Sequence, residues 1–463
     1  MATDSRTERD ALGEFAVPAT AHYGIDTARA AANFPISGER MPRALIRALG
    51  MLKAGAARAN RDLGLIGDDL ASAIQAAAEE VANGQWDQEF IVDVFQTGSG
   101  TSTNMNANEV IANRANELLG GGPLGVYRPV HPNDHVNRGQ SSNDVIPTAI
   151  HLAAVTEIRQ RLLPGLYRLE ASLQRKSSEF DDVVKTGRTH LMDATPIRLG
   201  QEFRGYAGQV ERARRRVTLA GEALREVALG GTAVGTGVNT HPEFAGRVLS
   251  FVSEREKVQL SQTTNHFQAQ SAMDAMVEAS GQLRSVSVSL VKVANDIRLM
   301  GSGPRAGLGE LRLPSLQPGS SIMPGKVNPV IPEAVIQVAA RVVGNDATIA
   351  MAGQWGFFEL NTMFPVAGAA LLQSIALLAA ASTVFAEKCV DGLEATERGP
   401  ESVERGLSIA TPLAEVVGYD RVAAIVNEAL ASGRTVRQVA SEELDLPPTE
   451  LERLLDARRM TGD

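Results

Sequence analysis

The sequence predicts a mainly α-helical protein of several domains, and three observations lead to this fold class. Aromatic residues make up only 4% of the 463 residues while alanine and leucine are plentiful, which favours helices over sheets. Apolar residues recur at alternating spacings of three and four along several long segments. The chain is also too long for one compact core, so we expect two or three domains.

The longest apolar stripe predicts a helix over residues 276–300 that packs nearly parallel to its neighbours. Its members are Met276, Ala279, Leu283, Val286, Leu290, Val293, Ile297 and Met300. Similar stripes predict four more long helices, over residues 146–180, 199–227, 335–349 and 371–385. We expect Pro164 to kink the first of these four. Together they predict a central bundle of five long helices.

The segments before and after this bundle differ from it in pattern. Residues 1–138 mix shorter helical stretches with breaks that contain glycine and proline. Residues 397–463 are rich in charged side chains, and their sequence patterns are short. We therefore expect an N-terminal domain over residues 1–138, a central helical-bundle domain over residues 139–396, and a small C-terminal helical domain over residues 397–463.

Several predicted helices are apolar on more than one side, most clearly residues 366–386. Gln373 and Ser374 interrupt this stretch, so we interpret it as a buried bundle helix and not a membrane span. Burial against copies of the same chain would cover the extra apolar surface, which predicts a homo-oligomer. The alternative is a monomer whose terminal domains cover that surface.

Charge and cysteine content exclude several classes of partner and cofactor. The net charge of −9 argues against a nucleic acid or an anionic membrane as partner. Cys389 is the only cysteine, so neither an intrachain disulfide nor a cysteine-ligated metal cluster can form. The first 15 residues have no apolar core of the kind that a signal peptide needs, and we expect a cytoplasmic protein.

Two polar segments in the first third of the chain suit the binding of a carboxylate. Residues 97–104 (TGSGTSTN) include Ser99, Gly100 and Thr101 and offer short hydroxyl and backbone N–H donors, although a plain helix cap explains them equally well. Residues 140–144 (QSSND) place Ser141, Ser142 and Asn143 where a helix N-terminus would hold an anion. Just before them, residues 131–135 (HPNDH) match no standard metal motif, so we expect no metal there.

Two later segments carry groups suited to acid–base chemistry. Residues 187–190 (GRTH) end in His190, and histidine is the usual acid or base in enzymes, although a lone histidine before a helix is more often structural. Residues 318–329 (PGSSIMPGKVNP) form an irregular loop in which Lys326 and Asn328 could close over an anion. A serine in this loop could act as a base only if several donors stabilised its alkoxide. A flexible linker would explain the glycines but not Lys326 and Asn328 together.

These four polar segments, in the order in which they occur, resemble the fumarase–aspartase superfamily. The resemblance covers nearly the whole chain. Residues 319–328 (GSSIMPGKVN) are similar to its signature, G-S-S-x-M-P-x-K-x-N. Thr189-His190 and Gly325 resemble the iron-independent fumarate hydratases, whereas aspartate ammonia-lyases typically carry Thr-Gln and alanine at these positions. Residues 96–101 (QTGSGT) and 358–361 (FELN) point the same way.

The resemblance implies a lyase that interconverts fumarate and L-malate through an aci-carboxylate. It implies that Ser320 is the base, that Lys326 and Asn328 hold the carboxylate that becomes the aci form, and that His190, oriented by Glu333, assists hydroxide departure through a water. The substrate-binding residues that it implies are Ser99, Gly100, Thr101, Ser141, Ser142, Asn143, Thr189, Ser321, Lys326, Val327 and Asn328. A second anion site would comprise His131, Pro132, Asn133 and Asp134.

The resemblance also implies a homotetramer whose helical core is shared by four subunits, with each active site built from three chains and no cofactor. Two segments depart from the fumarase pattern. Residues 23–27 (YGIDT) resemble the aspartase version, and Arg138-Gly139 differs from the pair in many relatives. The alternatives are therefore an aspartate ammonia-lyase, or a lyase on another C4 dicarboxylate, and a catalytically silent structural homologue.

Overall fold

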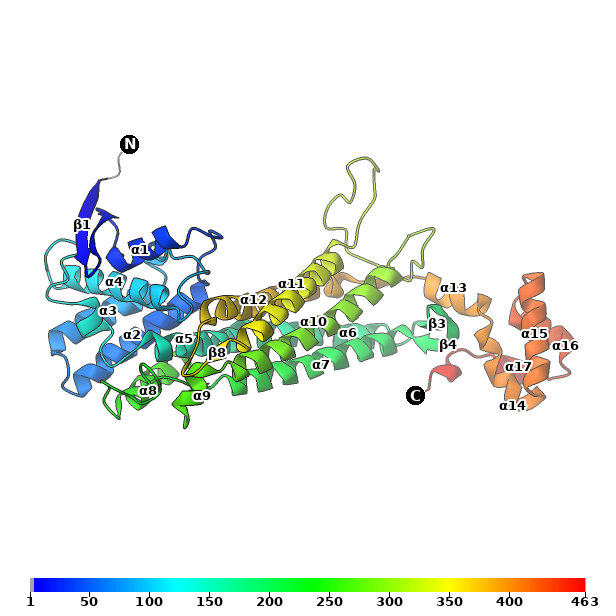
Figure 1. The fold of residues 1–463 in the computed structure, drawn as a ribbon. Coiled ribbons are helices and arrows are strands. Elements are labelled where there is room, and N and C mark those ends of the chain that lie inside the picture. The colour runs from blue at the N-terminus through cyan, green and yellow to red at the C-terminus, as the bar shows by residue number, and fades with distance from the viewer. Residues whose placement is uncertain (1–3, 463) are drawn as a thin grey trace. The chain divides into compact units, whose positions relative to one another are not determined.

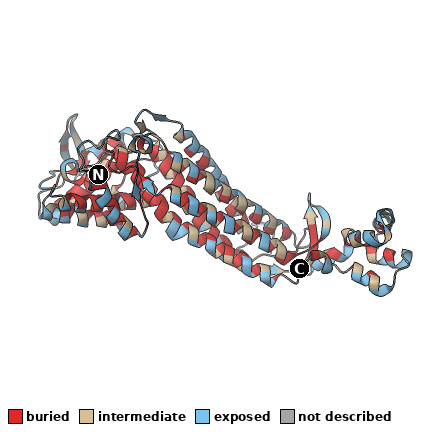
Figure 2. Ribbon diagram, turned by 90° about the horizontal axis from the view of Figure 1, so that it is seen from below, coloured by how far each residue is buried: buried red, intermediate tan, exposed pale blue. Residues whose placement is uncertain are grey.

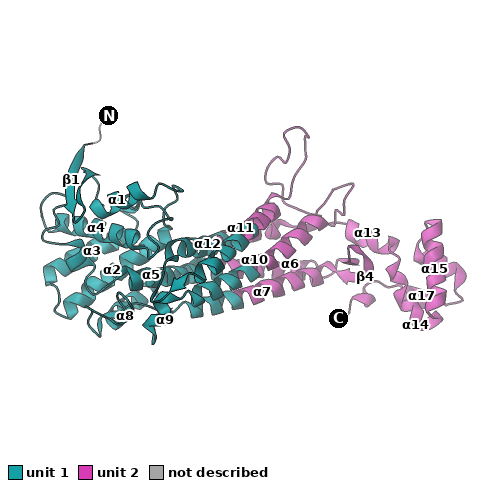
Figure 3. Cartoon of the chain, viewed as in Figure 1, with its two compact units in different colours: residues 1–163, 215–285, 340–379 teal, residues 164–214, 286–339, 380–463 magenta. Residues whose placement is uncertain are grey.

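The computed structural model describes residues 4–462, and its architecture is mainly helical, as the sequence predicts (Figure 1). The chain forms two compact units (Figure 3). Unit 1 comprises residues 1–163, 215–285 and 340–379, and unit 2 comprises residues 164–214, 286–339 and 380–463. The predicted domain boundaries after residues 138 and 396 remain a prediction.

Four long helices contribute residues to both units: α7 (Leu199–Ala223), α10 (Asp274–Met300), α11 (Val330–Gly353) and α12 (Phe364–Lys388). They correspond to four of the five predicted helices. All eight members of the stripe in α10 are buried, and Figure 2 shows buried residues along one side of the long helices. Burial of these apolar side chains stabilises the helices in place.

The fifth predicted helix is present but is not uniform. It consists of α5 (Ser142–Glu157), a π-helical turn η3 (Ile158–Leu162) and α6 (Leu163–Glu179). Proline has no N–H to donate, so the regular bond to the residue four positions before Pro164 cannot form, and the wider turn lies just before it. We expected a kink at Pro164, and the structure has a π-helical turn just before it.

Unit 1 is built around α2 (Arg43–Asp62), which packs against α3 (Asp68–Ala82), α5 and α8 (Phe244–Glu256). Its other elements are β1 (Ser5–Asp10), β2 (Gly13–Pro18), α1 (Ile25–Asn33), η1 (Asp87–Glu89), α4 (Thr101–Leu118), η2 (Pro132–Val136), β5 (Glu226–Val227), β6 (Ser261–Gln262), α9 (His266–Ser271), β8 (Gly356–Phe357) and β9 (Leu360–Asn361). We predicted no strands over residues 1–138, so the hairpin of β1 and β2 is an element that we did not foresee.

Unit 2 contains a hairpin and a group of short helices beside its segments of the long ones. Its elements are β3 (Val184–Thr189), β4 (Met192–Arg198), β7 (Leu311–Arg312), η4 (Val390–Gly392), β10 (Glu394–Ala395), α13 (Arg398–Arg405), η5 (Ser408–Leu413), α14 (Ala414–Val417), α15 (Tyr419–Ser432), α16 (Val436–Glu443), α17 (Pro448–Leu454) and η6 (Arg459–Thr461). The helices from α13 onward enclose a hydrophobic cluster of their own, which includes Leu413, Ile425 and Leu455.

The strands make only small sheets. Each sheet in residues 4–462 has two strands: β1 with β2, β3 with β4, β7 with β10 and β8 with β9 are antiparallel, and β5 with β6 is parallel. The apolar stretch that contains α12 is long and apolar enough to cross a membrane by length and composition, with 56% of its most apolar window buried. A buried core helix passes the same test, so this stretch is weak evidence for a span.

Candidate active site

The predicted site residues fall into two sets, one in each unit. Unit 1 holds Ser99, Gly100, Thr101, His131, Pro132, Asn133, Asp134, Ser141, Ser142 and Asn143. Unit 2 holds Thr189, His190, Ser320, Ser321, Lys326, Val327, Asn328 and Glu333.

In unit 1, a cavity of about 1040 Å³ brings together several separate segments of the chain. They are the start of α4, the stretch from η2 through the turn into α5, and the loop after β5, and Leu65 after α2 also contributes. Of the predicted residues, those that line the cavity are Thr101, Asn133, Asp134, Ser141, Ser142 and Asn143. Two polar segments that are distant in sequence therefore share one cavity, as the binding of a single ligand requires.

The glycine-rich turn reaches the cavity because two glycines shape it. Gly100, at the N-terminus of α4, has φ +75°, a left-handed conformation that glycine adopts without strain. A Cβ at Gly98 would lie 2.0 Å from the carbonyl oxygen of Thr362, so only glycine fits this close approach. The hydroxyl groups of Ser99 and Thr101 lie 2.7 Å apart. The turn thus presents short hydroxyl donors beside the first residues of a helix.

The N-terminus of α5 also lines the cavity. Ser141 caps the helix, and Asp144 accepts a hydrogen bond from the Ser141 N–H at 2.9 Å. The other oxygen of Asp144 accepts from the N–H groups of Gly230 and Thr232, both at 3.0 Å. Burial raises the pKa of Asp144 to about 6, against the effect of these three donors. The N-terminus of α5 is the positive end of its helix dipole, where an anion is favoured, and it carries Ser141, Ser142 and Asn143.

The predicted second anion site forms a tight π-helical turn. His131 Nδ1 accepts hydrogen bonds from the N–H groups of Asn133, at 3.2 Å, and Asp134, at 3.3 Å. The Asp134 carboxylate lies 3.4 Å from the same nitrogen. His131 and Pro132 do not line the cavity. Among residues 4–462, no group of three or more His, Cys, Asp or Glu side chains could hold a metal ion.

In unit 2, the Ser320 loop is closed by its own hydrogen bonds. The Gly319 N–H donates to the Lys326 carbonyl at 2.7 Å, and the Asn328 side-chain amide donates to the Gly319 carbonyl at 2.6 Å. Ser320 Oγ accepts from the N–H groups of Met323, at 2.9 Å, and Ile322, at 3.2 Å. Two donors on one hydroxyl oxygen favour its anionic form. They also fit an ordinary serine turn.

The ends of the loop leave its other predicted groups accessible. Ser321, Lys326 and Val327 are exposed, and Asn328 is half-buried just before α11. Glu333 follows in the first turn of α11 and is half-buried as well. The ammonium group of Lys326 makes no hydrogen bond or ion pair within residues 4–462. It is therefore a cation without a counter-charge from the described part of its own chain.

His190 lies in a hairpin turn, which corrects our expectation of a histidine leading into a helix. Thr189 of β3 pairs with Met192 of β4, so His190 and Leu191 form a two-residue turn with φ +57° and +62°. Turns of this geometry favour asparagine and glycine, because other side chains are strained there. Strain at an exposed histidine is typical of a functional position. No hydrogen bond joins His190 to Glu333 within the described chain.

Buried ion pairs fix this hairpin. Arg188 Nη2 donates to Glu310 Oε1 at 2.8 Å, and Lys185 Nζ lies 3.1 Å from Glu310 Oε2 and 2.9 Å from Glu202 Oε1. Glu310 and Lys185 are almost fully buried, so removal of one partner would leave an uncompensated charge in the protein. The base of the hairpin is therefore held firmly while its tip is exposed.

Both departures from the family pattern lie in unit 1. The N–H groups of Gly24, Asp26 and Thr27 all donate to the buried carboxylate of Glu109, at 2.9–3.1 Å. The backbone of that segment is thus engaged at the start of α1, and none of its residues lines the cavity. Arg138 does line it, and the Arg138 side chain is exposed.

Sequence reasoning missed several residues around this cavity. Asn104 and Thr232 line it, and each has a buried side-chain oxygen without a hydrogen-bond partner. Asn104 is the last residue of the segment over residues 97–104, but its side chain was not named as a binding group. Thr232 lies in a run of glycines that we did not single out.

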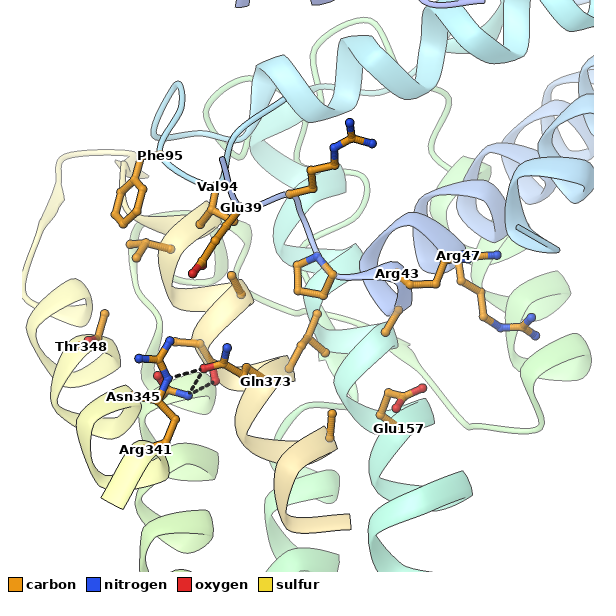
Figure 4. A pocket seen from close by; sticks show the side chains of 18 of the residues that line it. Glu39, Arg43, Arg47, Val94, Phe95, Glu157, Arg341, Asn345, Thr348 and Gln373 are labelled. Carbon is orange, nitrogen blue, oxygen red and sulfur yellow. Dashed lines mark hydrogen bonds between the residues drawn. The ribbon is translucent and has the colours of Figure 1, made fainter. Parts of the chain in front are cut away.

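A second cavity in unit 1, of about 800 Å³, contains none of the predicted site residues. It is surrounded by the start of α2, the end of α5, and parts of α11 and α12 (Figure 4). Gln373 Oε1 accepts from Arg341 Nε at 2.8 Å and from Asn345 Nδ2 at 3.0 Å. Arg43 and Arg47 pair with Asp87 and Glu256. Because these polar groups already have protein partners, we assign no chemistry to this cavity.

Comparison with known proteins identifies the family. A family model described as "Lyase" matches residues 13–344, and one described as "Fumarase C C-terminus" matches residues 409–462. A class II fumarate hydratase from Halobacterium salinarum is 55% identical over 462 residues, which covers 100% of this chain and 98% of that protein.

Solved structures agree over the same length. A class II fumarase from Schistosoma mansoni has a TM-score of 0.95 and 38% identity, and covers 99% of both chains. A fumarate lyase:delta crystallin from Brucella melitensis, bound to cobalt, has a TM-score of 0.95 and 47% identity over 99% of this chain and 100% of that one. The matches extend over both units and include both sets of predicted residues. The chain belongs to the class II fumarate hydratase family of lyases.

Proposed function

We propose that this protein catalyses the reversible hydration of fumarate to L-malate, by anti addition of water through an aci-carboxylate intermediate. Full-length similarity to class II fumarate hydratases supports this activity. The observation that carries the chemistry is the Ser320 loop, in which two backbone N–H groups point at the hydroxyl oxygen of the proposed base.

The chemical difficulty lies in the removal of a weakly acidic proton next to a carboxylate. Ser320, as the alkoxide, takes the C3 proton of malate, and the electron pair passes into the neighbouring carboxylate. Lys326 and Asn328 stabilise the second negative charge that develops there. The exposed, unpaired ammonium group of Lys326 suits this role, because no partner from the described residues competes for it.

The hydroxyl group of malate then leaves as water. His190, working through a bound water and oriented by Glu333, supplies the proton, and in the hydration direction it takes one back. Thr101, Ser141, Ser142, Asn143 and Thr189 bind the carboxylates and the hydroxyl group of the substrate. Hydration changes no net oxidation state, so the reaction needs no redox cofactor.

We propose further that the active form is a homotetramer in the cytoplasm, with each site built from three chains. Exposed apolar side chains on the long helices support the assembly. Val343 and Met351 on α11 are 43% and 61% exposed, and Val288 on α10 is 59% exposed. Covering such side chains with another copy of the chain is favourable. The absence of a bond from His190 to Glu333 within one chain fits a site whose members come from different subunits.

An ultraviolet assay tests the activity directly. Fumarate absorbance would be followed with fumarate alone, fumarate plus ammonium, L-malate, and L-aspartate. Loss of fumarate without ammonium, together with fumarate formation from L-malate only, is the expected result. Activity only with ammonium or L-aspartate would make the protein an ammonia-lyase, and no activity under any condition would favour a silent structural homologue.

A further inference from the structure

Lys53 is a buried lysine whose hydrogen-bond partners line the unit 1 cavity. It lies in α2, its side chain is fully buried, and none of it lines the cavity. Its Nζ donates hydrogen bonds to Asn137 Oδ1 and Gln140 Oε1, both at 3.0 Å. Burial of an ammonium group costs free energy unless the group makes hydrogen bonds. The two acceptors therefore fix the Lys53 side chain, and the Lys53 side chain fixes the two acceptors.

The two acceptors belong to the turn that leads into α5. The Asn137 side-chain amide donates to the Gln140 carbonyl at 3.2 Å, and the Gln140 amide donates to the Val136 carbonyl at 3.0 Å. Asn104 Nδ2 donates both to Asn137 Oδ1, at 3.2 Å, and to Ser142 Oγ, at 3.0 Å. One continuous network thus runs from Lys53 to the hydroxyl group of a residue that faces the cavity.

The same helix start is fixed from its other side by Asp144. Its carboxylate joins the Ser141 N–H to the N–H groups of Gly230 and Thr232, on the loop after β5. Desolvation lowers the pKa of Lys53 to about 7, and the nearby negative charge of Asp144 opposes this shift. Two fully buried ionisable side chains, Lys53 and Asp144, therefore hold the two sides of residues 140–144 through their hydrogen bonds.

We propose that Lys53 is a positioning residue for the dicarboxylate substrate: its bonds to Asn137 and Gln140 fix the turn that carries the donors Ser141, Ser142 and Asn143. This inference rests on the proposed role of those three residues in substrate binding. Lys53 itself touches no ligand. Its effect reaches the substrate only through the placement of the hydroxyl and amide donors on the cavity wall.

The first test compares two buried lysines. Lys53→Met keeps much of the side-chain volume and removes the charge, and Lys176→Met is the matched control. Lys176 is 4% exposed and donates to the Leu393 carbonyl at 2.7 Å, in unit 2 and outside the network. The readouts are the KM for fumarate, kcat, and the inhibition constant of succinate, an unreactive C4 dicarboxylate. We expect Lys53→Met to raise KM and the inhibition constant about tenfold, with a smaller change in kcat, and Lys176→Met to change neither.

The second test asks whether Lys53 acts through the turn. Asn143→Ala should weaken succinate binding in the wild type but add little in the Lys53→Met background, because the donors are already misplaced there. Fully additive effects, or an unchanged inhibition constant in Lys53→Met, would overturn the positioning role. If Lys53→Met does not fold, Gln140→Ala removes one acceptor from the other side and should raise the inhibition constant about threefold. An unchanged constant in that variant would refute the role as well.

The substrate-binding role of the wall has its own control. If Asn143→Ala, Ser141→Ala and Ser142→Ala all leave succinate inhibition unchanged in the wild-type background, the proposed binding wall is wrong, and the role of Lys53 falls with it. If those variants weaken inhibition but Lys53→Met does not, only the inference about Lys53 fails. The two failures are therefore distinguishable.

Discussion

Substitution of Gly98 by alanine should damage substrate binding far more than the addition of one methyl group suggests. The new Cβ would lie 2.0 Å from the Thr362 carbonyl oxygen and 2.7 Å from the Thr362 Cβ. A carbon and an oxygen need about 3.3 Å, so the two segments must separate by roughly 1.3 Å. The Phe364 N–H donates to the Gly98 carbonyl at 3.2 Å, and that bond would be lost on such a movement.

Two consequences follow for the measurements. Loss of the hydrogen bond and of local packing should lower the free energy of unfolding by about 2–4 kcal/mol. Displacement of Ser99 and Thr101 by about 1 Å should lower kcat/KM roughly a hundredfold, mainly through KM. Thermal melting at a fixed heating rate and steady-state fumarate hydration measure the two effects.

The matched control is Gly246→Ala. This glycine lies in the first turn of α8, in the same unit, and a Cβ there would meet no atom within 4 Å. We expect it to leave kcat/KM unchanged and to raise stability by about 0.5–1 kcal/mol, because alanine loses less conformational freedom in a helix. A Gly98→Ala protein with wild-type melting and kinetics would refute the steric argument.

Four further outcomes are expected. Ser320→Ala should lower kcat by several powers of ten with an unchanged far-ultraviolet circular dichroism spectrum; near-normal turnover would exclude Ser320 as the base. His190→Asn should lower kcat more than it raises KM, and a change confined to KM would count against proton transfer. Burial raises the pKa of Glu109 to about 7, above its unfolded value, so its stabilising contribution is complete below about pH 4.5 and is lost as the pH rises through 7. The melting temperature should therefore fall less between pH 5 and 8 in Glu109→Gln than in the wild type. Dialysis against a chelator should leave fumarate hydration unchanged, and a loss that added metal restores would contradict the metal-free mechanism.

The long helices could be predicted because their pattern is repeated many times. The stripe over residues 276–300 predicts a helix, and α10 spans Asp274–Met300. Each added helical turn places another apolar residue on the same buried face, so a single polar residue does not hide the apolar spacing of three and four. The polar segments were found for the opposite reason, because glycine, serine and proline at such density do not suit the interior of a long helix.

The hairpins and the buried charges could not be predicted in the same way. The strands β3 and β4 are short, and His190-Leu191 carries none of the usual turn signals, so the hairpin has no local signature. Lys53 occupies an ordinary position in an amphipathic helix, and its burial results from α5 and the turn before it, which lie more than 80 residues away. Contacts between distant segments decide whether such a lysine is exposed or buried.

The division of the chain into two units has a consequence for how such a protein can change over time. Each unit is assembled from three separate stretches of sequence, and α7, α10, α11 and α12 give residues to both. No contiguous piece of the gene therefore encodes either unit. Recombination cannot transfer one unit to another protein in a single exchange, and a crossover within any of the four helices joins halves that must still fit one another. Change in such a chain has to proceed by individual substitutions across its whole length.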